Sequence, residues 1–433
     1  MTKLDRFLGV ATTTVEDWTF ADADTSRGLH GLHPYPARMI PQIAHRLIEK
    51  YSRRGDVVLD PFCGSGTVLL ESMLLGRNSI GIDLNPLAIL LARAKSTPIE
   101  PHILRRQYND LIHKVSQDID DRKADKLIIP RPDLNENLEF WFKRHVIDDL
   151  ALLRRRLFEI REHKVRDFFL ACFSLTVRMV SNTRGKEFKL YRIPKDKLRG
   201  FNPNVFKVFR KNLEDGIRRM ESTFPYLSSE VWAKVILQDT RLLTLDRKAD
   251  LIVTSPPYGD SRTTVAYGQF SRYPALWCGL AENWHPQVTR ETIMKVDQLS
   301  LGGNGKIADI PDSAALHETL GRIGKRSEER ANDTALFFRD IKRAFERIYL
   351  AMNDNAHFCI VIGNRTVSRV RVPTDQILVE IGNMCGFRHL TTFCRRIPTK
   401  RMPWENAPEN IVGEKGKTIH EESIIILGKD RPR

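Results

Sequence analysis

The sequence predicts an α/β fold in which a mostly parallel central sheet with an antiparallel edge is interrupted by a largely helical insertion. Residues 55–96 contain two strand-and-helix units in series, and such a repeat implies that neighbouring strands run parallel. After a long charged stretch, short apolar segments at 235–239, 250–254 and 358–362 resume the same rhythm. Together these observations predict one sheet built from both sides of the insertion.

The first half of the sheet can be followed element by element. The strand at 57–59 leads through a glycine-rich turn into a helical pattern at 68–75. A second short apolar strand follows at 79–83, and Pro86 then occupies a first-turn position of a helix that continues to Lys95. The pattern indicates two consecutive units of a parallel sheet.

The second half of the sheet is read in the same way. A helical run at 334–352 precedes the strand at 358–362, and another helical stretch lies at 375–384. Strand candidates at 389–397 and 422–427 suit an antiparallel pair at one sheet edge. The expected organisation is a core formed by 30–97 and 231–433, a largely helical insertion at 98–230, and a polar loop or lid at about 280–330.

The composition indicates a folded, basic protein. The 433 residues carry a formal charge of +15, which favours a polyanionic partner, although a basic solvated surface has the same composition. The six cysteines lack the paired spacing of zinc sites or disulfide frameworks, so we expect no metal and a reducing, cytoplasmic setting. No secretion signal and no apolar run long enough to cross a bilayer are found, so we expect no membrane function.

The segment at 60–67, with the sequence DPFCGSGT, stands at the carboxyl end of the first predicted strand and opens a helix. Glycines there let the backbone approach a ligand, and the helix N-terminus offers unpaired N–H groups. Asp83 ends the second strand, where its carboxylate can accept hydrogen bonds from both ribose hydroxyls of a nucleoside. Asp239 ends the third strand and could accept an adenine amino group or simply cap the strand end. A tight turn without a ligand is the alternative, but the flanking strand, helix and acid favour a nucleoside site.

The strings DPFCGSGT and GIDLNP resemble the first two cofactor motifs of S-adenosylmethionine-dependent amino-methyltransferases. Upstream, HPYPARMIP at 33–41 resembles the N-terminal motif of that family, which packs over the methionine end of the cofactor; an ordinary proline-rich helix entry is the alternative. The resemblance covers about 30–97 and 232–430, and it implies a Rossmann-like methyltransferase fold that binds S-adenosylmethionine. The residues thereby assigned to the cofactor are Tyr35, Pro36, Asp60, Pro61, Phe62, Gly64, Ser65, Gly66, Thr67, Asp83, Asn85 and Asp239.

A second string, Ser255-Pro256-Pro257-Tyr258, follows the apolar strand at 250–254. The prolines stiffen the turn and remove N–H donors, which leaves main-chain carbonyls as acceptors. An exocyclic amine is a poor nucleophile because its lone pair is delocalised into the ring, and the Ser255 hydroxyl and Pro256 carbonyl can free that lone pair by accepting the amine hydrogens. Tyr258 offers a flat face for a base rotated out of a duplex. An isolated Pro-Pro-Tyr would be only a rigid loop, but its position downstream of DPFCGSGT favours catalysis.

The form of this string narrows what the resemblance implies. (S/D/N)PP(Y/F/W) is the catalytic signature of the family; SPPY is similar to the N4-cytosine DNA enzymes, whereas DPPY and NPPY are more usual for adenine N6 and other amino acceptors. A C5-cytosine enzyme would need a cysteine nucleophile after a proline, and the chain contains no Pro-Cys. We therefore expect site-specific methylation of a flipped-out base in DNA, with cytosine N4 favoured. The alternatives are adenine N6 in DNA, guanine N2 in RNA, and an inactive DNA-binding protein on this fold.

The expected partners follow from the resemblance and from the insertion. The resemblance implies double-stranded DNA, and a restriction-modification or related defence setting with a cognate endonuclease or defence proteins. It does not extend over the insertion, where basic and aromatic residues gather, a fair pattern for nucleic-acid binding that a solvated charged loop also explains. The candidates for DNA contact are Arg184, Lys186, Lys189 and Arg192, which accompany Phe188 and Tyr191.

Overall fold

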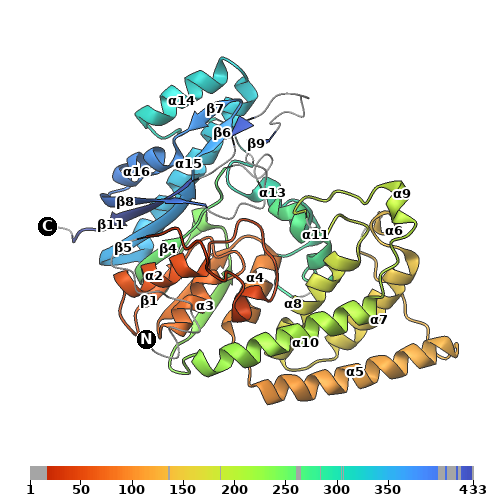
Figure 1. Cartoon of the computed structure of the whole chain (residues 1–433). Helices are drawn as coiled ribbons and strands as arrows, with labels where there is room; N and C mark the ends of the chain where they lie inside the picture. Colours follow the sequence, from red (N-terminus) through yellow and green to blue (C-terminus); the bar gives the residue numbers. More distant parts are fainter. Residues whose placement is uncertain are drawn as a thin grey trace.

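A seven-stranded sheet forms the centre of the molecule, with helices on both faces and a helical extension at one end (Figure 1). The strand order is β3-β2-β1-β4-β5-β11-β8. The predicted fold class is confirmed. The computed structural model describes residues 17–134, 137–185, 187–259, 265–282, 284–303, 305, 307–397, 405–406, 416–417 and 421–431.

The sheet is parallel except for the insertion of β11 near one edge. The parallel strands are β1 (Val57–Asp60), β2 (Asn78–Asp83), β3 (Ala233–Leu237), β4 (Ala249–Thr254) and β5 (Met352–Gly363). β11 (Glu421–Gly428) runs antiparallel to both β5 and β8 (Arg388–Arg396), which confirms the predicted antiparallel edge. β5 begins six residues before the predicted strand at 358–362, because its polar start Asn353-Asp354-Asn355 gives no apolar signal.

Apolar side chains alternate along the strands and pack against helices on the two faces of the sheet. On one face, Val58 and Leu251 contact the apolar stripe of α2 (Pro41–Tyr51). On the other, Leu59, Ile252 and Phe358 pack against α15 (Glu328–Ala351) and α16 (Thr374–Met384). The two crossover helices of the first half are α3 (Thr67–Leu74) and α4 (Pro86–Ser96).

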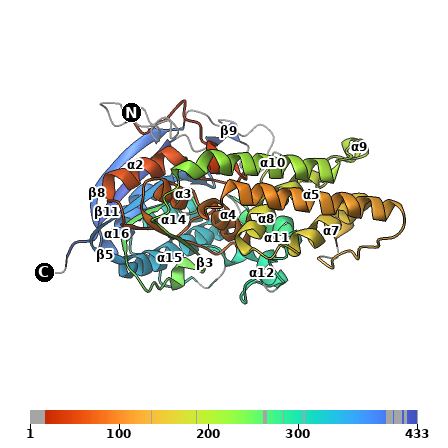
Figure 2. The same cartoon turned by 90° about the horizontal axis from the view of Figure 1, so that it is seen from below.

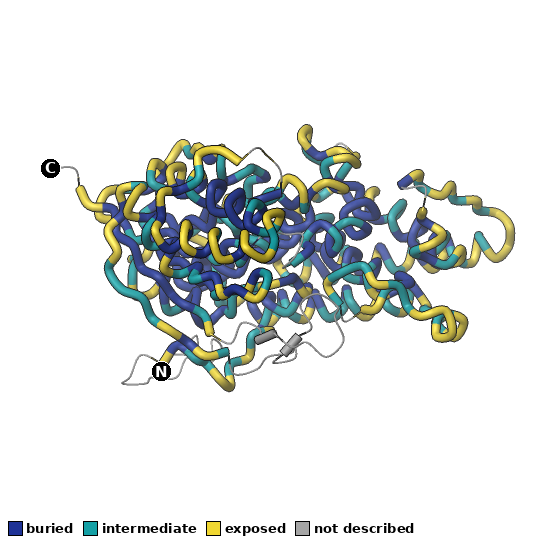
Figure 3. The backbone as a smooth tube through the Cα atoms, turned by 90° about the horizontal axis from the view of Figure 1, so that it is seen from above, coloured by how far each residue is buried: buried dark blue, intermediate teal, exposed yellow. Residues whose placement is uncertain are grey.

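The insertion is a helical layer that leaves the sheet after α4 (Figure 2). Its long helices are α5 (Pro101–Lys123), α7 (Arg144–Phe158), α8 (His163–Val180) and α10 (Val205–Thr223), with short α6 (Leu138–Trp141) and α9 (Lys195–Leu198). α8 packs on α4 and on α11 (Tyr267–Trp277), so the insertion shares a buried core with the helices beside the sheet (Figure 3). The described helices include none long and apolar enough to span a membrane.

The described residues of the segment at 280–330, expected as a polar loop or lid, form three short helices before α15 begins at Glu328. They are α12 (Arg290–Met294), α13 (Val296–Leu299) and α14 (Ala314–Gly324). Thr289 forms a capping box for α12, and Ser313 caps α14 by accepting from the Leu316 N–H.

Short two-stranded ribbons pair β6 (Arg365–Val367) with β7 (Val370–Val372) and β9 (Glu405–Asn406) with β10 (Gly416–Lys417).

Candidate active site

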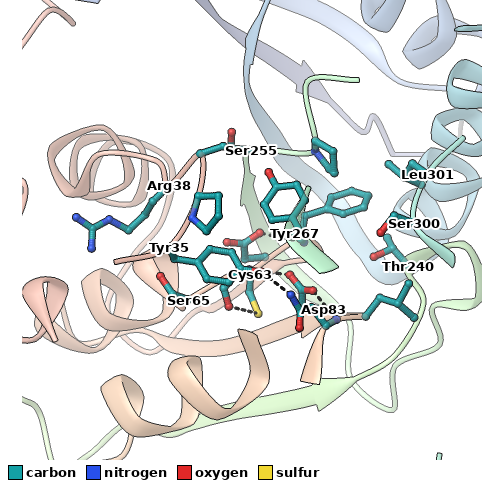
Figure 4. A pocket seen from close by; sticks show the side chains of 18 of the residues that line it. Tyr35, Arg38, Cys63, Ser65, Asp83, Thr240, Ser255, Tyr267, Ser300 and Leu301 are labelled. Atoms are coloured by element: carbon teal, nitrogen blue, oxygen red, sulfur yellow. Dashed lines mark hydrogen bonds between the residues drawn. The ribbon is translucent and has the colours of Figure 1, made fainter. Parts of the chain in front are cut away.

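A cavity of about 900 Å³, counting its open mouth, lies at the carboxyl ends of the parallel strands (Figure 4). Tyr35, Arg38 and Ser65 lie at one end of it, and Thr240, Ser300 and Leu301 at the other. Of the sequence-predicted residues, Pro61, Gly66, Pro256 and Tyr258 do not line the cavity but are chain neighbours of residues that do. The predicted residues that line it are Tyr35, Pro36, Asp60, Phe62, Gly64, Ser65, Thr67, Asp83, Asn85, Asp239, Ser255 and Pro257.

The glycine-rich turn between β1 and α3 depends on two left-handed residues. Gly64 has φ +48° and Gly66 has φ +81°, conformations that residues with a Cβ rarely adopt. A Cβ on Gly66 would lie 2.9 Å from the Ala92 Cα, so glycine also permits the close approach of α3 to α4. A Cβ on Gly64 would lie 3.2 Å from the Tyr35 ring. The turn is therefore shaped to bring backbone N–H groups and the Tyr35 ring to the same wall of the cavity.

Two carboxylates lie at the centre of this wall. Asp83 accepts hydrogen bonds from the backbone N–H groups of Gly64 at 2.9 Å and Asn85 at 2.8 Å. Burial nevertheless raises the pKa of Asp83 to about 6. Asp60 accepts from the Thr254 hydroxyl at 2.6 Å, and burial raises its pKa to about 7. Both acids therefore titrate near neutrality, with Asp83 placed to accept further hydrogen bonds from a ligand in the cavity.

Asn85 connects the N-terminal segment that carries Tyr35 to the cavity wall through hydrogen bonds. Its Oδ1 caps α4 by accepting from the Leu87 N–H at 3.1 Å. Its Nδ2 donates to the Tyr35 hydroxyl at 3.1 Å and to the Ser271 hydroxyl of α11 at 2.6 Å. The Tyr35 ring lies 5.9 Å from that of Tyr267, which also lines the cavity. One side chain thus joins three segments that are far apart in the sequence.

The other end of the cavity is built around an ion pair. Asp239 follows β3 and accepts from the Arg241 backbone N–H at 2.9 Å, so it caps the short 3₁₀ helix η3 (Thr240–Leu242), and its carboxylate pairs with the Arg241 guanidinium at 2.6 Å. Arg241 also donates to buried Asp340 at 2.7 Å and to the Leu299 carbonyl at 2.8 Å. Asp297 holds the same segment by accepting from the Gly268 N–H at 2.8 Å. These contacts hold 296–301 against the cavity, within the segment expected as a loop or lid.

The Ser-Pro-Pro-Tyr turn follows β4 directly and is held by β11. The Tyr258 hydroxyl donates to the Glu422 carboxylate at 2.8 Å, and the Ser255 hydroxyl donates to the Tyr258 oxygen at 3.4 Å. Arg395 of β8 pairs with Glu422 at 3.4 Å. Burial, reinforced by the Glu422 charge, raises the pKa of Tyr258 well above its usual value, so Tyr258 remains a donor. Sequence reasoning missed Glu422, because only the pairing of β11 with β5 brings it to this edge.

The candidate DNA-contact residues lie in a loop beside α11. Thr183 and Arg192 form an isolated antiparallel bridge, and the Leu190 N–H donates to Gln269 of α11 at 3.2 Å. The loop exposes 45% of Phe188 and 47% of Tyr191. Arg184 forms an ion pair with Glu187 at 3.3 Å, and the Arg192 guanidinium lies 4.0 Å from the Phe140 ring centre. Lys189 belongs to the same loop, whereas Lys186 lies outside the described residues.

Comparison with known proteins identifies the family. A family model described as DNA methylase, of the N6 and N4 type, matches residues 6–93. The type II methyltransferase M.MvaI of Kocuria varians is 36% identical over 432 residues, covering 94% of this chain and 92% of the relative. The chain belongs to the DNA N6/N4 amino-methyltransferase family.

Further matches cover more than nine-tenths of this chain. The type II methyltransferase M.BsoBI of Geobacillus stearothermophilus is 32% identical over 455 residues, covering 94% of this chain and 87% of the relative. Among solved structures, an rRNA methyltransferase, aviRa of Streptomyces viridochromogenes, is 11% identical with a TM-score of 0.32, covering 92% of this chain and 88% of that one. As a DNA N6/N4 amino-methyltransferase, the protein is S-adenosylmethionine dependent and acts on DNA. Groups of three or more acidic, His or Cys side chains able to hold a metal are absent from the described part of the chain.

Proposed function

We propose that this enzyme transfers a methyl group from S-adenosylmethionine to the N4 amino group of a cytosine rotated out of double-stranded DNA. The observation that carries the proposal is that Ser255 and Pro257 line the same cavity as the glycine turn and Asp83. The proposed nucleoside site at Asp83 and the Ser-Pro-Pro-Tyr turn, which offers carbonyl acceptors, therefore border the same cavity. The Ser-Pro-Pro-Tyr form favours cytosine N4 over adenine N6, which is the main alternative acceptor.

The cavity offers S-adenosylmethionine a matching set of groups. Asp83 would accept the ribose hydroxyls, and the turn at 64–67 would contact the ligand through its backbone. Asp239 would receive the adenine amino group at the end near Thr240, with Arg241 fixing its orientation. Tyr35 and Pro36 would cover the methionine end. The bound cofactor supplies a methyl group that is already electrophilic, so the chain's own task is alignment.

The order of hydrogen bonds at the catalytic turn favours Ser255 as an acceptor. Tyr258 gives its hydrogen to Glu422, and Ser255 gives its own hydrogen to Tyr258, so the lone pairs of the Ser255 oxygen remain for the amine. The Pro256 carbonyl would accept the second amine hydrogen. The nitrogen lone pair would then point at the methyl group. Glu422 acts through Tyr258 in this scheme and is a positioning residue.

Tyr258 has a second role in the proposal. Its ring would stack on the extruded cytosine, while the bond from its hydroxyl to Glu422 fixes the plane of the ring. Pro257 stiffens the chain on the other side of the turn. The flipped base would therefore be held by stacking and oriented by two acceptors.

The acceptor polymer is tested by incubating the protein with radiolabelled S-adenosylmethionine and either plasmid DNA or bulk RNA. We expect label in the DNA and none in the RNA. Label in RNA alone would support guanine N2 methylation of RNA instead. Cofactor and DNA binding without any transfer would indicate an inactive DNA-binding protein on this fold.

We also propose that the insertion at 98–230 contributes to DNA recognition through the loop that carries Arg184, Lys189 and Arg192. The bond from Leu190 to α11 joins this loop to the helix that supplies Tyr267 to the cavity. Exposed Phe188 and Tyr191 beside the cations suit contact with nucleic acid. A cognate restriction endonuclease, or another defence protein, is the proposed functional partner in the cell.

Replacing Arg184, Lys189 and Arg192 together by alanine should weaken DNA binding and flatten its salt dependence. Each lost phosphate contact removes about one unit from the slope of log affinity against log salt, so we expect a decrease of about two to three units. Fluorescence anisotropy across a salt titration measures this slope. A control variant with alanine at Arg322 of α14, at its C-cap Lys325 and at Arg347 of α15 removes the same formal charge elsewhere. Equal slopes for the two variants would remove this loop from the DNA interface.

A further inference from the structure

A lysine buried behind the glycine turn is not used by the proposed mechanism. Lys95, near the end of α4, is 0% exposed, and its Nζ donates to the Ser65 hydroxyl at 3.0 Å. Within the described part of the chain, this hydroxyl is its hydrogen-bond partner and no carboxylate pairs with it. A buried ammonium without a counter-charge is costly, so Lys95 would keep its proton only where an anion lies nearby.

The surroundings of Lys95 have the charge of an anion site. Burial, and then repulsion from Arg38 and Arg219, lowers the pKa of Lys95 well below its usual value. The Arg38 guanidinium donates only to the carbonyls of Thr25 and His30 among the described contacts. Tyr35, Arg38 and Ser65 lie together at one end of the cavity (Figure 4). The described residues placed at this end include the cation Arg38 and no carboxylate, whereas Asp60 and Asp83 lie at the centre of the cavity wall.

Ser65 connects the buried cation to the cavity. It lines the cavity although it is only 2% exposed. Because the Ser65 oxygen accepts from Lys95, the hydroxyl hydrogen is free to be donated to a ligand. An anion at this point would receive a hydrogen bond from Ser65 and would favour the protonated form of Lys95.

We propose that Lys95, acting through Ser65, is the counter-charge for the α-carboxylate at the methionine end of S-adenosylmethionine. The inference rests on the proposed placement of the cofactor, with adenine at Asp239 and methionine at Tyr35. Lys95 does not touch the ligand in this arrangement; it is a positioning residue that polarises the Ser65 hydroxyl. If Lys95 has this role, its replacement should weaken only the binding of ligands that carry the α-carboxylate.

The test compares S-adenosylmethionine with decarboxylated S-adenosylmethionine, which keeps the sulfonium and the nucleoside but lacks the carboxylate. Calorimetric affinities of both ligands are measured for the wild type, Lys95→Met and Ser65→Ala. We expect Lys95→Met to bind S-adenosylmethionine at least about ten-fold more weakly and the decarboxylated ligand within about two-fold of wild type. Ser65→Ala should shift the same ratio in the same direction. Lys114→Met, an exposed change on α5, should leave the ratio unaltered.

The outcomes separate a positioning role from a structural one. Equal weakening of both ligands by Lys95→Met would show that the lysine merely supports the turn, and would overturn the proposal. Unchanged affinity for both ligands would overturn it as well. Failure of the wild type to bind either ligand would instead contradict the proposed cofactor site. The affinity of Lys95→Met for the decarboxylated ligand also reports that the variant is folded.

Discussion

Replacing Ser255 by alanine should lower the rate of methyl transfer to DNA by about 100-fold, because Ser255 orients the amine as a hydrogen-bond acceptor and a misplaced reacting group costs about 100-fold in rate. The affinity for S-adenosylmethionine should change little, since Ser255 is assigned to the amine and not to the cofactor. The catalytic rate is measured in single turnover with labelled cofactor. Binding is measured separately by calorimetry.

Two substitutions of Tyr258 separate the contribution of its ring from that of its hydroxyl group. Tyr258→Ala removes the stacking surface, worth about 1–3 kcal/mol per base, and should also lower transfer without weakening cofactor binding. Tyr258→Phe keeps the ring but breaks the bond to Glu422, so it should retain more activity than Tyr258→Ala. If Ser255→Ala transfers methyl groups at the wild-type rate, the proposed orientation of the amine is wrong.

Asp83→Ala should weaken S-adenosylmethionine binding by about 100-fold or more, because two hydrogen bonds to a charged acceptor are worth about 1.5–3 kcal/mol each. The effect should also depend on pH. The pKa of Asp83 is raised to about 6, so the carboxylate becomes protonated as the pH falls through that value and loses acceptor strength. Wild-type affinity should therefore fall below pH 6, measured by calorimetry in matched buffers.

The control for Asp83→Ala must account for the turn that this carboxylate supports. Asp83 also accepts from the Gly64 and Asn85 N–H groups, so its loss disturbs the glycine turn as well. Asp83→Asn retains one oxygen acceptor and should lose less affinity than Asp83→Ala. Wild-type affinity in a folded Asp83→Ala protein would mean that the ribose lies elsewhere.

The motifs that could be predicted from the sequence are those in which the important residues lie close together along the chain. The turn at 60–67 and Asp83 each follow a short apolar strand, so their place at the carboxyl edge of the sheet follows from the topology of parallel strands alone. The same holds for the turn that begins at Ser255 after β4. Local order along the chain was enough to bring these segments to one cavity, although Pro61, Gly66, Pro256 and Tyr258 do not line it.

The parts that were missed depend on contacts between distant segments. Glu422 reaches Tyr258 only because β11 returns antiparallel beside β5, and nothing in its own sequence indicates that neighbour. The segment 296–301 was expected as part of a loop or lid, but its bonds to Arg241 and to α11 join residues that are distant in the sequence. In the sequence, Lys95 looks like an ordinary basic residue at a helix end, where the helix dipole favours a positive charge. Its complete burial, which only the structure shows, is what points to the proposed role at the methionine end of the cofactor.

Methylation of cytosine N4 is tested by the chemical identity of the methylated nucleoside. DNA methylated by the purified enzyme is digested to nucleosides and analysed by mass spectrometry against standards. We expect the modified nucleoside to be N4-methylcytosine. N6-methyladenine alone would contradict the choice of base while leaving the amino-methyltransferase mechanism intact. A C5-methylated cytosine would contradict the mechanism itself, because that carbon requires a covalent nucleophile that the Ser-Pro-Pro-Tyr turn does not provide.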